Sequence, residues 1–199
     1  MSLLEDHVTE TERLIKEEAI KIRKEIDAVA LAIADKDVRD EYYSFSGDDV
    51  WKMEEYFPQL HRASGLISIM STIDAGLLDV CRYLALKKNV PQTLTRNRRG
   101  SDVWGAKEFL NDRLGVRNVW GDASWEAIRF GIMIRNALVH ESGVVTKDEL
   151  KEYISRTAGL AIDAATGKVV FEEGYLPRLL GTVKQFFSSV MEEAALAQP

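Results

Sequence analysis

The residues of this chain whose types and spacing could carry out chemistry lie close together in the last third of the sequence. Arg135, Asn136 and His140 fall within six consecutive positions, in the run Arg-Asn-Ala-Leu-Val-His. On a helix with 100° per residue, Asn136 and His140 lie one turn apart on the same face. Arg135 is about 140° away from His140, so only its long side chain lets both groups reach one cleft. The set offers an acid–base group, a cation suited to phosphate oxygens and an amide.

Two copies of this set across a two-fold axis would place a pair of imidazoles around one phosphate, as RNA cleavage requires. We predict that His140 takes the proton of the 2′-hydroxyl or protonates the leaving 5′-oxygen. Arg135 is expected to stabilise charge on the pentavalent phosphorane, and Asn136 to orient His140 or the scissile phosphate. The products would be a 2′,3′-cyclic phosphate and a 5′-hydroxyl. The sequence predicts no metal and no cofactor for this reaction.

The run from Ile134 to Gly143 also resembles a known motif. It is similar to the R-x(4–6)-H signature of HEPN domains, including the polar residue after the arginine, and Trp125 upstream fits the same pattern. The resemblance implies a helical bundle that commonly dimerises. Many members are metal-independent endoribonucleases in toxin–antitoxin, CRISPR-associated and anti-phage defence systems. We therefore expect a homodimeric hydrolase that binds RNA, with a cognate antitoxin or another partner protein as a further candidate partner.

Two other interpretations of the same residues stay open. A HEPN-like bundle can keep the motif and act without catalysis, as a module that binds nucleic acid or protein. The motif can also be purely structural, because cations near a helix C-terminus interact favourably with its dipole. Arginine and histidine at this spacing are a weak signal, and asparagine directly after the arginine makes a chance match rarer. Whether the chain is an enzyme is left open at this point.

Charge is distributed unevenly along the 199 residues. The net charge is −6, but residues 1–60 carry −8, residues 61–140 carry +5 and residues 141–199 carry −3. Such asymmetry indicates a localised anion-binding face. The densest basic part runs from residue 82 to residue 99 without an acidic residue, and its six cations are candidate RNA-binding residues: Arg82, Lys87, Lys88, Arg96, Arg98 and Arg99. The alternative is a solvated loop rich in cations.

The sequence lacks the motifs of several other classes of enzyme and binding protein. The chain has no phosphate-binding loop, no dinucleotide-binding glycine pattern, no H-E-x-x-H and no nucleophile elbow. Its three histidines, His7, His61 and His140, do not fall at metal-ligand spacing. Cys81 is the single cysteine and lies among apolar residues, so we expect a core side chain and a reducing compartment. The acidic N-terminus and short apolar runs favour a cytoplasmic protein without a membrane partner.

Hydrophobic periodicity predicts a mainly α fold. A long amphipathic helix is expected from Leu3 to about Ile33, and a helix that long usually packs against another helix or a second subunit. A buried helix is expected from Phe57 to about Leu86, after a short turn capped by Asp48 and Asp49. The remaining expected elements are helices near 101–114, 124–140, 146–157 and 175–195, with Ser124 and Thr146 as caps, and a β-hairpin near 160–172.

Together these elements predict a single domain over residues 1–199. Its architecture would be an up-and-down, HEPN-like helical bundle with one small β-hairpin, and residues 1–34 would be a dimerisation or partner-binding element.

Overall fold

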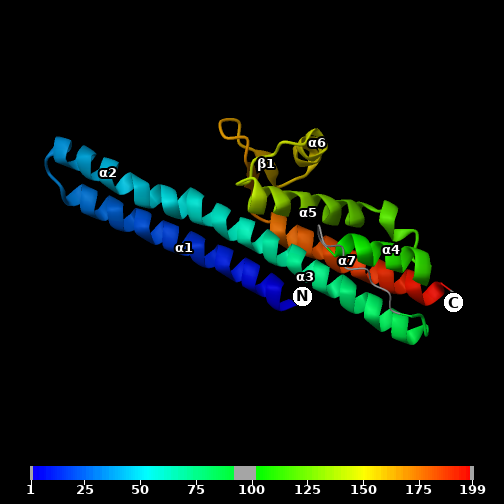
Figure 1. Ribbon diagram of the computed structural model, residues 1–199. Helices are drawn as coiled ribbons and strands as arrows, with labels where there is room; N and C mark the ends of the chain where they lie inside the picture. Colours follow the sequence, from blue (N-terminus) through cyan, green and yellow to red (C-terminus); the bar gives the residue numbers. More distant parts are fainter. Residues whose placement is uncertain (1, 92–101, 198–199) are drawn as a thin grey trace. The chain divides into compact units, whose positions relative to one another are not determined.

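The computed structural model describes residues 2–91 and 102–197 of the chain (Figure 1). The described part is mainly helical, which confirms the predicted fold class at that level. The elements in chain order are α1 (Ser2–Ala32), α2 (Lys36–Trp51), η1 (Lys52–Tyr56), α3 (Phe57–Lys87), α4 (Val103–Leu114), η2 (Val119–Gly121), α5 (Ala123–His140), α6 (Asp148–Arg156), β1 (Leu160–Ile162), β2 (Val169–Phe171) and α7 (Tyr175–Leu196).

Contacts divide the chain into two compact units, which we call unit 1 (Leu66–Pro199) and unit 2 (Ser2–Gly65). Helix α3 begins in unit 2 and ends in unit 1. The predicted single domain over residues 1–199 stays a prediction, and each unit is described by itself below.

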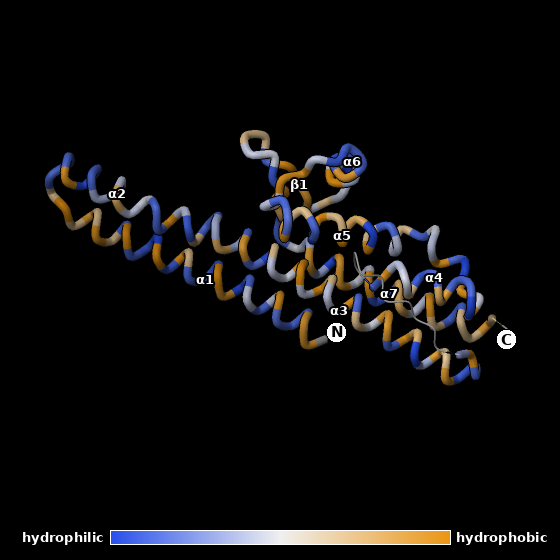
Figure 2. Tube along the Cα trace, viewed as in Figure 1, coloured by the Kyte–Doolittle hydropathy of each residue, from blue (hydrophilic) through white to orange (hydrophobic). Residues whose placement is uncertain are grey.

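Unit 2 is built from α1, α2, η1 and the first residues of α3. Figure 2 shows α1 alternating between hydrophilic and hydrophobic residues along its length, which is the amphipathic pattern expected for it. Polar contacts fasten α1 to the following helices: Arg23 donates to both carboxylate oxygens of Glu54 at 2.7 and 2.6 Å, and Arg62 Nε donates to Glu12 at 2.8 Å. The long N-terminal helix is confirmed.

The helix α2 was missed by the sequence prediction. Its N-cap is Asp35, whose carboxylate accepts from the backbone N–H groups of Asp37 and Val38 at 2.8 and 3.2 Å. The predicted turn capped by Asp48 and Asp49 is wrong, because both residues lie inside α2. Between α2 and α3 the chain stays helical through the π-helical turn η1, so the two helices form one continuous stretch.

Unit 1 has a closely packed core around α3, α5 and α7. Two glycines permit close approach: a Cβ on Gly131 would lie 2.8 Å from the Met70 side chain, and one on Gly76 would lie 3.0 Å from the ring of Phe187. The core side chains of α3 are Leu66, Ile69, Met70, Ile73, Leu77, Cys81 and Leu84. Cys81 is fully buried as expected, and burial raises the pKa of its thiol to about 12.

The stretch Lys36–Lys87 is long and apolar enough to cross a membrane, judged by length and composition alone. A core helix passes the same test, and Leu66, Ile73 and Leu77 of this stretch are buried in unit 1. The expected lack of a membrane partner stays a prediction.

The small β-hairpin is confirmed. Strands β1 and β2 pair antiparallel with Leu160 opposite Phe171 and Ile162 opposite Val169. The segment after α5 continues this pairing, since Val145 N donates to the Gly167 carbonyl at 2.9 Å and Val169 N donates to the Gly143 carbonyl at 3.0 Å. The hairpin therefore fixes the chain directly beyond the end of α5.

Two predicted caps are wrong. The residue at the N-cap of α5 is Asp122, and Ser124 is buried in the first turn of the helix. The N-cap of α6 is Lys147, and the Thr146 hydroxyl donates to Glu141 at 3.1 Å instead of capping the helix. Ser124 is thus already inside the helix, and the hydroxyl of Thr146 is engaged by a residue on the preceding turn of the chain.

Candidate functional site

The three predicted catalytic residues lie on the C-terminal half of α5, and the N-terminal half of that helix anchors them. Trp125 is buried there, with its ring edge-on to Trp120 and Trp104 at centroid distances of 5.0 and 5.5 Å and stacked on Phe186 at 5.9 Å. The ammonium of Lys107 lies 5.1 Å from the Trp125 ring centroid, a favourable cation–π distance. This cluster fixes the direction in which α5 runs.

Helix α6 covers one side of α5. The rings of Phe130 and Tyr153 stack at 4.0 Å, and Arg156 donates to Glu126 at 2.7 Å. At its far end α5 stops at His140, and the chain turns away through Gly143, which has φ of +84° and donates its N–H to the Ala137 carbonyl at 2.9 Å, as expected for a glycine just beyond a helix end. Both ends of the helix are therefore held by specific contacts.

Arg135 and Asn136 are in direct contact. Arg135 Nη1 donates to Asn136 Oδ1 at 3.0 Å, and both side chains are partly buried. Among the described residues Arg135 has no carboxylate partner, whereas Arg129 and Arg156 beside it pair with Glu149 and Glu126. The guanidinium of Arg135 therefore keeps donors that an anionic ligand can take.

His140 is exposed at the last position of α5. Its imidazole makes no hydrogen bond or ion pair with any side chain or backbone group in residues 2–91 and 102–197. Val139 beside it is also half exposed, so this side of the helix end is open over neighbouring positions. One chain thus brings Arg135 and Asn136 together and presents His140 on the same open end of α5, where His140 makes no hydrogen bond or ion pair with either of the other two.

A small recess adjoins Asn136, and sequence reasoning missed the residues on its other side. It has a volume of about 40 Å³ and is lined by Asn136, Glu141, Thr146 and Lys147, with apolar side chains below. Lys147 is exposed and has no carboxylate within ion-pair distance among the described residues. The sequence signal that could have indicated Lys147 is its position eleven residues after Asn136. The run 146–149, however, has the pattern of a helix cap, which points to a structural role.

The described members of the predicted RNA-binding group lie at the other end of unit 1. Lys88 Nζ donates to the Ala197 carbonyl just beyond α7, at 2.5 Å. The end of α5 instead neighbours the hairpin, whose Phe171 contacts Tyr175 at the start of α7, with ring centroids 5.7 Å apart. Helix α7 has 22 residues and spans about 33 Å between these points. Figure 1 shows the same opposite placement.

Two of these basic residues are also engaged locally. Arg82 pairs with Asp79 at 2.9 Å, and the Lys87 ammonium lies over the Tyr83 ring at 5.9 Å. Arg96, Arg98 and Arg99 lie outside the described residues. In the structure, Arg82, Lys87 and Lys88 therefore lie at the end of unit 1 opposite to His140.

Within residues 2–91 and 102–197, no group of three or more His, Cys, Asp or Glu is placed to hold a metal ion. Comparisons with protein-family models, with curated proteins and with solved structures find no match for this chain.

Proposed function

We propose that this chain is a metal-independent endoribonuclease of the HEPN type, active as a homodimer and acting in toxin–antitoxin or anti-phage defence. Arg135, Asn136 and His140 are the residues that we assign to the reaction. The single observation that carries the proposal is the open end of α5, where Arg135 holds Asn136 at 3.0 Å without a carboxylate partner in the described chain and His140 is exposed. If these side chains only filled the core of the bundle, they would be buried, whereas His140 is exposed and Arg135 and Asn136 are only partly buried.

The roles follow from the chemistry of the three groups. Imidazole transfers protons near neutral pH, so His140 acts as the base toward the 2′-hydroxyl or as the acid toward the 5′-oxygen. The guanidinium of Arg135 binds two phosphate oxygens and stabilises the charge that develops on the phosphorane. Asn136 fixes the direction of Arg135 and keeps its amide donors for the scissile phosphate.

One chain supplies one imidazole, whereas cleavage needs both an acid and a base. A second copy related by a two-fold axis supplies the other imidazole, so the active form is a dimer. The half-exposed Val139 between the polar residues gives this helix end an apolar surface that a second copy can cover.

The proposal is tested by incubating the purified chain with single-stranded RNA of mixed sequence in EDTA. We expect cleavage by the wild type, and a loss of at least about 100-fold in rate for His140→Ala and for Arg135→Ala. Matched controls are Arg129→Ala, an arginine of the same helix paired with Glu149, and His7→Ala, an exposed histidine of unit 2. Both controls should cut like the wild type, provided that circular dichroism shows folded protein.

A second candidate function is a non-catalytic bundle that binds a partner, and unit 2 gives the observation that favours it. Large apolar side chains are exposed along unit 2, with Phe45 at 83% and Leu31 at 78%. Intact RNA after incubation with folded dimer would favour this candidate over the nuclease. If deletion of residues 1–34 then abolished capture of a partner while the rest stayed folded, the binding role would be supported.

A further inference from the structure

Unit 2 buries very few of its apolar side chains. Among its described residues the buried hydrophobic side chains are Val8, Ala19 and Ala30, and two of these are alanines. Two long helices can cover each other only along one stripe, so each keeps apolar residues that need a further neighbour. A helical pair of this size gains too little from its own core to be stable without such a neighbour.

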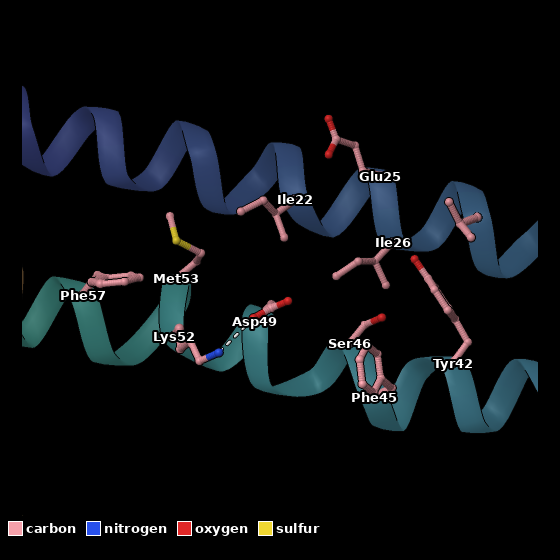
Figure 3. Close-up of a pocket in the computed structure, with 11 residues that line it drawn as sticks. Ile22, Glu25, Ile26, Tyr42, Phe45, Ser46, Asp49, Lys52, Met53 and Phe57 are labelled. Atoms are coloured by element: carbon pink, nitrogen blue, oxygen red, sulfur yellow. Dashed lines mark hydrogen bonds and ion pairs between the residues drawn. The ribbon is translucent and has the colours of Figure 1, made fainter.

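The uncovered side chains form a groove between α1 and α2. Figure 3 shows Ile22 and Ile26 of α1 facing Tyr42 and Met53, with the ring of Phe45 lying over α2; all five residues line a cavity of about 530 Å³. Phe45 is 83% exposed, and Val29 and Phe57 of the same groove are 48% and 40% exposed, so the groove presents a contiguous apolar surface of the kind that marks an interaction site. The remaining lining residues are Glu25, Val29, Ser46, Asp49, Lys52 and Phe57.

The charge of the groove decides between kinds of occupant. Unit 2 as a whole is acidic, and residues 1–60 carry −8. The groove is nearly neutral by contrast, because Lys52 pairs with Asp49 at 3.0 Å and only Glu25 remains. A basic peptide would need acidic residues along the groove, and a second copy of this chain needs a surface without strong like-charge repulsion. The groove satisfies the second requirement.

The available area also suits a second copy. Helix α1 has 31 residues and is about 46 Å long, and two helices side by side are about 20 Å wide. The face is therefore on the order of 900 Å², against about 800 Å² per partner in a stable protein–protein interface. Two such faces pack as a four-helix bundle, in which a self-complementary patch meets itself across a two-fold axis.

We propose that the groove lined by Ile22, Ile26, Phe45 and Met53 is the dimer interface of this chain, with each copy's Phe45 buried in the other copy's groove. All of these groove residues belong to unit 2, whereas the residues assigned to catalysis belong to unit 1. The interface proposal does not depend on the ribonuclease assignment. When two copies are joined through unit 2, the α5 end of one copy meets the α5 end of the other at a higher effective concentration than in free solution.

The test is the mass of the full-length chain in solution, measured by light scattering and sedimentation over a concentration series. The wild type is expected to be a dimer at micromolar concentration. Phe45→Glu places a charge in the interface and should weaken dimerisation on the order of 100-fold. Leu31→Glu is the matched control, because Leu31 is 78% exposed and does not line the groove, and this variant should stay dimeric.

Each other outcome overturns the proposal. A monomeric wild type would show that the groove awaits a different occupant, such as another protein. A Phe45→Glu variant that remains dimeric, or a Leu31→Glu variant that also dissociates, would place the interface elsewhere. Because Phe45 is exposed in the single chain, its substitution should leave the helical content unchanged, and circular dichroism checks this. The readout is mass, so a failed RNA cleavage assay leaves the result interpretable.

Discussion

Unit 1 and unit 2 use helices of equal length in opposite ways. Helices α1 and α3 each have 31 residues, but α3 buries a continuous row of large side chains in unit 1, while α1 buries one valine and two alanines. In unit 1, α3 has both α5 and α7 as neighbours, and glycines bring them close. In unit 2, the neighbours of α1 are α2, η1 and the first turns of α3. Two helices of the same length therefore bury very different cores, because burial depends on how many neighbours a helix has and not on its length.

The two units also suit two different roles. The residues suited to chemistry lie on α5, a helix of unit 1 whose two ends are fixed by the Trp125 cluster and the hairpin. A fixed helix holds catalytic groups to a defined geometry, as a reaction requires. Most of the large apolar side chains that are exposed in the described residues lie on unit 2, where they suit binding.

The largest expected difference is between two phenylalanines. Phe186 is fully buried in unit 1, so Phe186→Ala should lower the free energy of unfolding by about 4 kcal/mol at every protein concentration. Phe45 is 83% exposed in the single chain, so Phe45→Ala should cost less than about 0.5 kcal/mol at dilutions where the dimer dissociates. The loss in free energy of unfolding caused by Phe45→Ala should grow with protein concentration, because the dimer forms at higher concentration. Urea unfolding at two concentrations measures both. Equal losses at high dilution would contradict the contrast between the units.

A smaller effect is expected at Glu193 of α7. Burial raises the pKa of this carboxyl, but backbone N–H groups of Arg117, Asn118 and Val119 and the Asn118 side chain donate to it, and together they hold the pKa below its ordinary value. The carboxylate therefore stabilises the folded state above its unfolded pKa, and that contribution is lost as pH falls through the lowered folded pKa. Glu193→Gln should cost about 1 kcal/mol at pH 7.

The pH series supplies the check on Glu193. The difference between Glu193→Gln and the wild type should shrink as the pH falls below about 4.5, where the wild-type carboxyl also becomes neutral. A difference that persisted unchanged at the acidic end would mean that the loop 117–119 does not depend on the charge. Glu192→Gln, a neighbouring exposed carboxyl, is the matched control.

The smallest effect is expected for the ion pair between Arg23 and Glu54 in unit 2. Both side chains are exposed, and solvent and salt screen such pairs. Arg23→Gln should leave the melting temperature unchanged within experimental error, at both low and high salt. A clear loss of stability that disappears in high salt would show that unit 2 depends on its charges more than on apolar contacts.

Much of the fold could be predicted because its periodicity is strong. The long helices near Ser2–Ala32 and Phe57–Lys87, the helix from Tyr175 and the hairpin near 160–172 follow the expected patterns. Helix α2 was missed because the pattern at Asp48 and Asp49 predicts the cap of a short turn, whereas both residues lie inside the helix. The cap is Asp35, thirteen positions earlier. Acidic residues occur inside helices as well as at caps, so local type alone does not locate a boundary.

The candidate site was predictable only in part. Arg135 and Asn136 do meet, because neighbouring residues on a helix with one long side chain can reach each other. Lys147 was not found, since only tertiary folding brings the start of α6 to Asn136. The basic group near Arg82 was chosen by composition, and the path of α7 places its described members at the far end of unit 1. The distribution of charge along a sequence does not show which charged residues come together in the folded chain.

The most direct test of the central claim is the chemistry of the RNA ends made by the wild-type chain in EDTA. The account predicts fragments with 2′,3′-cyclic phosphates and 5′-hydroxyls, identified by mass spectrometry, and no cutting of an otherwise identical strand of 2′-deoxynucleotides. Intact RNA with folded, dimeric protein, or fragments that carry 5′-phosphates, would contradict the assignment of Arg135 and His140 as catalytic residues.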